Sequence, residues 1–298
     1  MSATLAPRRG TIAPAALLEL LKPITWFAPV WAFGCGVLSA GVPLGRCWPV
    51  ALLGAVLAGP LLCGASQATN DWFDRHVDAI NQPERPIPSG RIPGRWGLAI
   101  AIGWSLLALA ASWSLGRVVF AAAACGTVLA WCYSAPPLRL KSNGWFGNLA
   151  VGVSYEGLSW FAGAAAAAGA MPGERTILLA ALYSLATFGI MILNDFKSVG
   201  GDTVLRLRSL PVQLGVGRAA RLACMAMAVP QVLVIALLLR WQAPIHAGAV
   251  GLLLLAQFAL MPRLLRAPER EAVRYNATGT SLLVLGMLAA ALALRVQG

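Results

Sequence analysis

The chain has 298 residues, of which 58% are hydrophobic and only 11% charged, and its mean hydropathy is +0.72. Soluble domains carry about 25% charged residues, so this composition excludes a soluble globular protein and indicates an integral membrane protein. The net charge of +12 does not indicate a nucleic-acid partner, because no soluble basic domain exists to bind one.

A helix that crosses a bilayer needs about 20 apolar residues, and nine stretches of the chain are long enough. Their approximate bounds are residues 24–44, 49–69, 97–116, 118–137, 147–169, 176–193, 219–239, 245–262 and 276–294. No polar linker divides them. We therefore expect an all-α fold, a polytopic membrane helical bundle of about nine transmembrane helices. It forms one domain over residues 1–298, with residues 1–15 as a flexible N-terminal segment.

Lysine and arginine residues are distributed unevenly between the two ends of these spans. The N-terminus and the connections after spans 2, 4, 6 and 8 hold 18 of the 23, and the opposite connections and the C-terminus hold 5. Because cytoplasmic loops of membrane proteins carry the excess of positive charge, this distribution predicts a cytoplasmic N-terminus. The connections after spans 2 and 6, which contain every aspartate of the chain, are then cytoplasmic as well.

The five aspartates lie in two polar segments. They are Asp71, Asp74 and Asp78 in the first segment, and Asp195 and Asp202 in the second. If the first segment is helical, its carboxylates fall within about 60° of one face, where like charges repel unless a cation lies among them. Oxygen ligands without His or Cys suit Mg²⁺, whose coordination is completed by water and phosphate oxygens. We therefore interpret the segments as two halves of a catalytic site that holds Mg²⁺ around one diphosphate, with all five aspartates as metal ligands.

The residues that follow each aspartate segment predict where its helix ends. Four prolines between residues 83 and 93 end the first helix after about Ile80 and leave a stiff, non-helical connection. Such a connection is either a cap over the site or a rigid surface turn. Gly200 and Gly201 favour a break in the second segment, so Asp202 would reach the site from a loop.

Several charged residues outside these segments allow two interpretations of their role. Arg139 and Lys141 follow span 4, and Arg206 and Arg208 follow the second aspartate segment. These cations match a diphosphate, or they are flanking charge that sets the topology. Glu156 lies near the middle of span 5, where an acid is costly. It is therefore either a functional residue or a protonated glutamate that bonds to a neighbouring helix.

Three blocks of the sequence resemble the UbiA-type intramembrane prenyltransferases, and within them the chlorophyll and bacteriochlorophyll synthases. The blocks are NDWFDRHVDAINQPERPIPSGRI, YSAPPLRLKSNGWFGNLAVGVSYEGLSWF and NDFKSVGGD…RSLPVQLGV. The likeness extends from about residue 15 to the C-terminus. It implies nine transmembrane helices and two aspartate-rich motifs, after helices 2 and 6, that bind Mg²⁺ and an allylic diphosphate.

The resemblance also implies which residues bind substrates. The implied set is Lys22, Asn70, Tyr133, Arg139, Lys141, Glu156, Asn194, Lys197, Arg206 and Arg208. Within it, Glu156 is expected to line the pocket for the macrocycle, where a protonated carboxyl could donate to a ring carbonyl. Gly200 departs from the family's pattern, which has Glu at this position, so the second segment offers two acids rather than three.

By this resemblance the chain esterifies the propionate carboxylate of (bacterio)chlorophyllide with a geranylgeranyl or phytyl group from the allylic diphosphate. The reaction needs Mg²⁺ and releases diphosphate. The resemblance further implies a bacterial cytoplasmic (inner) membrane, including photosynthetic intracytoplasmic membrane, and pigment-biosynthesis or photosynthetic assembly proteins as partners. The same chemistry on a quinone precursor or haem is an alternative that the aspartates alone do not separate. A cation transporter is more distant, because transporters usually bind ions near the bilayer midplane.

Overall fold

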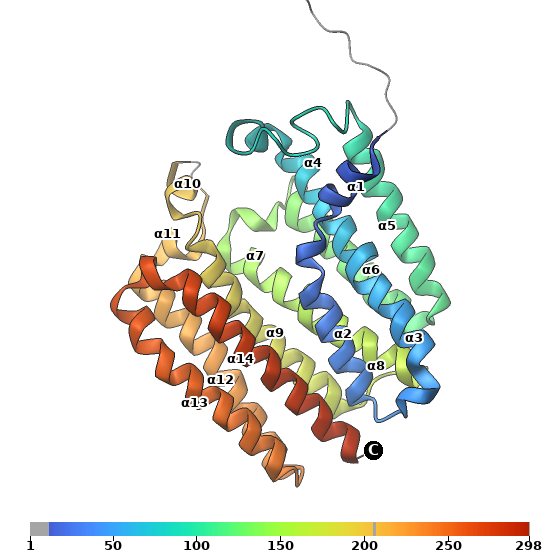
Figure 1. Cartoon of the computed structure of the whole chain (residues 1–298), viewed down its shortest axis with the longest axis vertical. Helices are drawn as coiled ribbons and strands as arrows, with labels where there is room; N and C mark the ends of the chain where they lie inside the picture. Colours follow the sequence, from blue (N-terminus) through green and yellow to red (C-terminus); the bar gives the residue numbers. More distant parts are fainter. Residues whose placement is uncertain (1–11, 205–206, 298) are drawn as a thin grey trace, which may run out of the picture.

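The computed structural model describes residues 12–204 and 207–297, and over these residues the chain is an all-α bundle (Figure 1). The elements, in chain order, are α1 (Pro14–Leu21), η1 (Pro23–Thr25), α2 (Phe27–Ser39), α3 (Leu44–Val56), η2 (Leu57–Cys63), α4 (Gly64–Asn81), α5 (Trp96–Ser114), α6 (Arg117–Ser134), η3 (Leu140–Ser142), α7 (Gly144–Val151), η4 (Gly152–Leu158), α8 (Ser159–Ala168), α9 (Glu174–Asp195), α10 (Val199–Val204), α11 (Leu210–Leu214), α12 (Val216–Arg240), α13 (Pro244–Arg266) and α14 (Pro268–Gln297). Of these, η1 and η3 are 3₁₀ turns, and η2 and η4 are π-helical.

Seven helices of the described residues are long and apolar enough to cross a membrane. An eighth is added if the bent pair Pro14–Thr25 and Phe27–Ser39, which meet at 57°, forms one span. The chain from Gly144 to Ala168 is also helical throughout, as α7, η4 and α8, but it is not among the seven. Each predicted span overlaps one of these helices. The all-α membrane fold is therefore confirmed, whereas the count of nine stays a prediction.

The centre of the bundle is formed by α2, α8, α9 and α12. Here α9 lies against α12, and α2 lies against α8. Trp160 of α8 stacks on Tyr183 of α9, with ring centroids 5.6 Å apart and planes at 12°, and both side chains are fully buried. A side chain at Gly36 or Gly163 would clash with the backbone of the facing helix. These two glycines therefore allow the close crossing of α2 and α8.

A reciprocal pair of amides joins α12 to α13. Gln231 and Gln257 are both fully buried, and the Nε2 atom of each donates to the Oε1 atom of the other, at 3.1 and 3.2 Å. An amide in apolar surroundings is costly unless it is hydrogen-bonded. The pair therefore favours one relative position of the two helices over others that would separate the amides.

Two helices contain a π-helical segment. η2 follows α3 and carries Pro60, which has no backbone N–H to donate to the α-helical hydrogen-bond ladder. η4 separates α7 from α8 and carries Tyr155 and Glu156. The chain stays helical through η2, so α3, η2 and α4 form one helix of 38 residues. π-Helical segments often mark functional sites, and residues of both segments line one cavity.

The connections that carry the aspartates gather at one end of the bundle. In Figure 1, α1, the connection between α4 and α5, α10 and α11 lie at the upper end, and the C-terminus lies at the lower end. The helix that carries the first aspartate segment, α4, ends at Asn81, one residue beyond the predicted end at Ile80, and residues 82–95 are non-helical. α1 begins at Pro14, inside the segment expected to be flexible, and the first eleven residues lie outside the described part of the chain.

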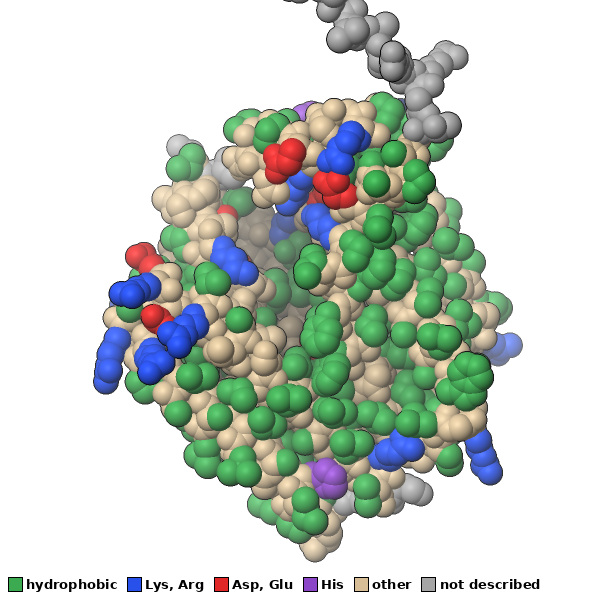
Figure 2. Space-filling view, viewed as in Figure 1, with side chains coloured by type: hydrophobic (Ala, Val, Ile, Leu, Met, Phe, Trp, Pro, Cys, Tyr) green, Lys and Arg blue, Asp and Glu red, His purple; other side chains and the backbone are tan. Residues whose placement is uncertain are grey.

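Figure 2 shows the same face with its side chains. Hydrophobic side chains cover much of its lower part, as a bilayer requires, and acidic and basic side chains gather towards the upper end. Below these charges the surface is hollowed. The site lies at this end of the molecule.

Candidate active site

Two adjoining cavities connect the aspartate segments to the interior of the bundle. The first, of about 350 Å³, is lined by polar residues that include Asp74, Asp78, Asp195 and Asp202. The second, of about 470 Å³, extends between α2, α4, α6, η4 and α9 and is lined mainly by apolar side chains. Asn70 and Tyr133, both predicted to bind substrate, line both cavities. The structure thus brings four of the five aspartates to one pocket that joins an apolar chamber.

Asp71 is the most buried of the predicted metal ligands, with 1% of its surface exposed. Its Oδ1 atom accepts hydrogen bonds from Lys22 Nζ at 2.6 Å and from Arg85 Nη1 at 3.3 Å. The same arginine atom lies 2.7 Å from Asp78 Oδ2, so it bridges two aspartates on one face of α4. The Oδ2 atom of Asp71 is buried and has no hydrogen-bond partner in the described residues.

Asp74 is held by the connection that follows α6. Arg139 Nη2 lies 3.3 Å from its Oδ1 atom, and Lys141 Nζ lies 2.5 Å from its Oδ2 atom. Burial lowers the pKa of the Lys141 ammonium below its ordinary 10.5, and the neighbouring carboxylate of Asp74 opposes this shift. Arg139 and Lys141, the two cations of this connection that were predicted to bind the diphosphate, therefore already contact an aspartate.

Asp195 ends α9 and is fixed by a residue from α7. Asn148 Nδ2 donates to Asp195 Oδ2 at 2.9 Å, and Asn148 is 4% exposed. The backbone N–H of Leu210 is a second hydrogen-bond donor to this carboxylate. The preceding residue, Asn194, accepts a hydrogen bond from Asn276 Nδ2 of α14 at 2.7 Å, which ties α14 to the site.

Asp202 lies in α10, so the predicted helix break at Gly200 and Gly201 is wrong. The N–H of Asp202 donates to the carbonyl oxygen of Ser198 at 2.8 Å, and Ser198 Oγ donates to Asp202 Oδ2 at 2.9 Å. Each glycine costs a helix about 1 kcal/mol relative to alanine, which hydrogen bonds of this kind offset. Asp202 reaches the pocket from this short helix rather than from a loop.

Three of the predicted substrate-binding cations that the structure describes, Lys22, Lys197 and Arg208, do not line either cavity. Lys197 is exposed, and its Nζ atom lies 3.5 Å from Asn194 Oδ1. Arg208 is exposed, and its backbone bonds to Ser142 and Gly144, which joins the chain after α10 to the connection that carries Lys141. Arg206 lies outside the described residues.

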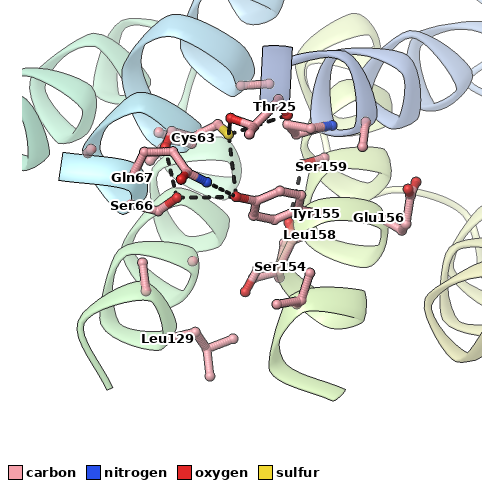
Figure 3. A pocket seen from close by; sticks show the side chains of 18 of the residues that line it. Thr25, Cys63, Ser66, Gln67, Leu129, Ser154, Tyr155, Glu156, Leu158 and Ser159 are labelled. Atoms are coloured by element: carbon pink, nitrogen blue, oxygen red, sulfur yellow. Dashed lines mark hydrogen bonds between the residues drawn. The ribbon is translucent and has the colours of Figure 1, made fainter. Parts of the chain in front are cut away.

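The wall of the apolar chamber carries a hydrogen-bonded polar cluster centred on Tyr155 of η4 (Figure 3). Tyr155 Oη accepts from Gln67 Nε2 at 3.0 Å and lies 3.4 Å from both Ser66 Oγ and Cys63 Sγ. The cluster joins η4 to η2 and α4. Glu156, the next residue, points away from this cluster, lines the same chamber and is 3% exposed.

Sequence reasoning did not find three of the residues that hold the aspartates in place, Arg85, Asn148 and Ser198. Arg85 lies among the prolines of the connection after α4. From the sequence, its charge indicated only that this connection is cytoplasmic. Asn148 carried a signal that was overlooked, because an amide inside an apolar span needs a hydrogen-bonding partner. Ser198 stands at the place of a middle aspartate in the second segment and bonds to Asp202 instead of acting as an acid.

The donor set of the polar pocket fits a hard divalent cation. Among the described residues no three His, Cys, Asp or Glu side chains form a ready-made metal cluster. Four separate carboxylates line the pocket, and the buried Oδ2 atom of Asp71, on the same helix as two of them, lacks a partner in the described residues. Mg²⁺ is commonly held by one or two carboxylates together with water and substrate phosphates, so separated carboxylates are compatible with it.

Comparison with known proteins identifies the family. The UbiA prenyltransferase family matches residues 27–285 of this chain. The chain belongs to the UbiA prenyltransferase family. This prenyltransferase is 54% identical over 287 residues to the bacteriochlorophyll synthase 33 kDa chain of Cereibacter sphaeroides, covering 96% of this chain and 95% of that one.

Further relatives extend the likeness of this UbiA-family prenyltransferase beyond bacteria. It is 40% identical to the chloroplastic chlorophyll synthase of Oryza sativa, over 93% of this chain and 76% of that one. Its fold is similar to that of a UbiA homolog from Archaeoglobus fulgidus bound to GPP and Mg²⁺, with a TM-score of 0.71 and 20% identity. That alignment covers 90% of this chain and 99% of the other.

Proposed function

We propose that this prenyltransferase esterifies the propionate carboxylate of (bacterio)chlorophyllide with a geranylgeranyl or phytyl group taken from the allylic diphosphate. The names of the relatives support the acceptor. The observation that carries the proposal is the junction of a charged pocket with an apolar chamber at Asn70 and Tyr133. The charged pocket suits the diphosphate, and the chamber that joins it suits the apolar parts of the two substrates.

The charged pocket supplies groups for the diphosphate. Arg139 and Lys141 line this pocket and contact Asp74, and Arg85 contacts Asp78, which also lines it. Lys22 contacts Asp71 on the same helix face as Asp78, and an entering diphosphate offers these four cations a second anionic partner. The five aspartates would hold Mg²⁺, which when bound stabilises the negative charge of the leaving diphosphate. Asn148 and Ser198 orient two of these carboxylates, which limits the rearrangement needed when substrate binds.

The bond changes balance without an added acid or base. The bond between the allylic carbon and the diphosphate oxygen breaks, and its electron pair leaves with the diphosphate. A carboxylate oxygen of the acceptor forms the new bond to that carbon and gives the ester. Because the carboxylate is already ionised near neutral pH, no general base is required. The apolar walls of the chamber would keep water from the electron-poor carbon.

The cellular setting follows from the same proposal. The protein would lie in the cytoplasmic membrane of a photosynthetic bacterium, including its intracytoplasmic membrane, with the aspartate end towards the cytoplasm. Pigment-biosynthesis or photosynthetic assembly proteins would receive the esterified pigment, which is too apolar to diffuse freely through water.

The test uses the full chain in membranes. Bacteriochlorophyllide or chlorophyllide is incubated with geranylgeranyl or phytyl diphosphate and Mg²⁺, and the esterified pigment is measured by chromatography. We expect Mg²⁺-dependent ester and released diphosphate in equal amounts. Parallel arms with a quinone precursor and with haem distinguish the alternative acceptors. Prenylation of either of these in preference to both chlorophyllides would overturn the proposed acceptor.

A further inference from the structure

The polar side chains of the apolar chamber differ in whether they already have partners. Most are satisfied locally: Thr69, Ser105 and Thr127 each donate to a carbonyl of their own helix. Tyr155 is satisfied by its cluster with Gln67 and Ser66. These groups can line the chamber at no hydrogen-bonding cost, whatever molecule fills it.

Two side chains of the same chamber are not satisfied. The Oε2 atom of Glu156 and the Oγ1 atom of Thr187 are buried and have no hydrogen-bond partner in the described residues. Their residues are 3% and 4% exposed. A buried polar group left unpaired costs about 1–3 kcal/mol, so two of them in one chamber indicate a ligand group that completes them.

The two residues are carried by elements that approach each other closely. Glu156 belongs to η4 and Thr187 to α9. Gly152 and Gly157 of η4 have no side chains where they face Ser184 of α9, and a Cβ at either would clash with that residue. Glu156 and Thr187 therefore line the chamber from two elements in close contact. Figure 3 shows that Glu156 points to the opposite side of η4 from Tyr155.

We propose that Glu156 and Thr187 form a hydrogen-bonding subsite for a carbonyl oxygen on the acceptor's ring, and that the ring therefore occupies the inner chamber. The inference rests on the proposed function. An isoprenoid tail offers no hydrogen-bonding group and would leave both side chains unpaired. A neutral carboxyl group and a hydroxyl are both donors, and the neutral carboxyl is the less costly form in apolar surroundings. Two donors converging on one acceptor would suit a carbonyl, which has two lone pairs.

The test measures acceptor binding directly, without turnover. The full-length protein in lipid nanodiscs is titrated with bacteriochlorophyllide in the absence of prenyl diphosphate, and pigment absorption or fluorescence gives Kd. Thr187→Val keeps the shape of the side chain and removes its hydroxyl donor. Glu156→Leu likewise removes the carboxyl donor, whereas Glu156→Gln keeps a donor at that position. We expect Thr187→Val and Glu156→Leu each to raise Kd about tenfold, and Glu156→Gln to stay within about threefold of the unaltered protein.

A matched control separates substrate recognition from helix packing. Ser184→Ala removes a buried hydroxyl one turn earlier on α9, which donates to the carbonyl of Ala180 in its own helix. It should leave Kd unchanged. An acceptor analogue whose ring carbonyls are replaced by CH₂ groups should bind the unaltered protein more weakly, and the Glu156→Leu, Thr187→Val double variant should not distinguish the two pigments. In turnover assays the KM of the acceptor should rise in Thr187→Val and in Glu156→Leu, while that of the prenyl diphosphate stays unchanged.

Each outcome bears on a different claim. If the unaltered protein neither binds nor esterifies bacteriochlorophyllide, the proposed function and this subsite both fail. If it does both, and Thr187→Val and Glu156→Leu keep its Kd, only the subsite is overturned. Equal changes in the KM of both substrates, or a Ser184→Ala effect as large as that of Thr187→Val, would show that these residues act in helix packing.

Discussion

The buried carboxylate of Asp71 contacts cations from two different parts of the chain. Lys22 reaches it from the turn between α1 and η1, and Arg85 reaches it from the connection after α4. A charged pair in such surroundings is costly to break by removing one partner, because the other charge stays buried. The identity of this residue therefore matters to the charge of the site and to the position of α1.

Replacing Asp71 by asparagine tests the proposed metal site. Asn keeps the shape but removes the charge that Mg²⁺ needs, so we expect turnover to fall on the order of 100-fold and half-maximal activity to need more Mg²⁺. Glu269→Gln removes an exposed acid of α14 and serves as the control. Near-normal turnover of Asp71→Asn in protein that is still inserted would contradict the catalytic assignment.

Lys141 gives the site a pH dependence. Burial lowers its pKa below 10.5, so the ammonium loses its proton at a lower pH than a free lysine and with it part of the attraction for a diphosphate. We expect kcat/KM for the prenyl diphosphate to fall on the alkaline side, as pH rises through this lowered pKa. Lys141→Arg should move the fall to higher pH, because guanidinium stays protonated. An unchanged alkaline limb in the variant would rule Lys141 out as its cause.

At the scale of elements, the bundle is held by close crossings and by a few buried polar pairs. Gly36 and Gly163 bring α2 and α8 together, and Gln231 and Gln257 join α12 to α13. In a membrane the apolar faces of helices are equally well solvated by lipid, so such local features carry much of the specificity of packing.

The amide pair predicts a non-additive pattern of stability. Gln231→Leu leaves the amide of Gln257 unpaired, and we expect it to lower the free energy of unfolding by about 1 kcal/mol. The double variant with Leu at both positions should recover most of that loss, since no polar group stays unsatisfied. Thermal unfolding in detergent checks this. A double variant that is less stable than both single variants would indicate that the pair has no such role.

At the scale of the whole molecule, all the described aspartates lie towards one end of the bundle. The bias of 18 to 5 basic residues predicts that this end faces the cytoplasm. A reporter that is active only in the cytoplasm should be active when fused after Asn81 and inactive when fused after Gly298. Activity at Gly298, or none at Asn81, would reverse the orientation.

Much of this architecture could be predicted, because bilayer burial imposes long apolar segments that composition reveals directly. Every predicted span overlaps a helix, and the helix before the prolines ends at Asn81. The position of all five aspartates at one end of the bundle could also be predicted from the sequence, because acidic side chains are costly inside the membrane. What failed was local and depended on individual side-chain hydrogen bonds. Ser198 stabilises a helix through two adjacent glycines, and Asn148 finds its partner in α9, neither of which chain order shows.

The cations already bonded to the aspartates also determine how much positive charge the site still lacks. Lys22, Arg85, Arg139 and Lys141 are one fewer than the five aspartates of the two segments. A prenyl diphosphate adds about three negative charges near neutral pH. Two divalent ions bring this assembly to electroneutrality, which a partly buried site favours, whereas one ion leaves two charges uncompensated. At low Mg²⁺, turnover should therefore rise with about the second power of the Mg²⁺ concentration.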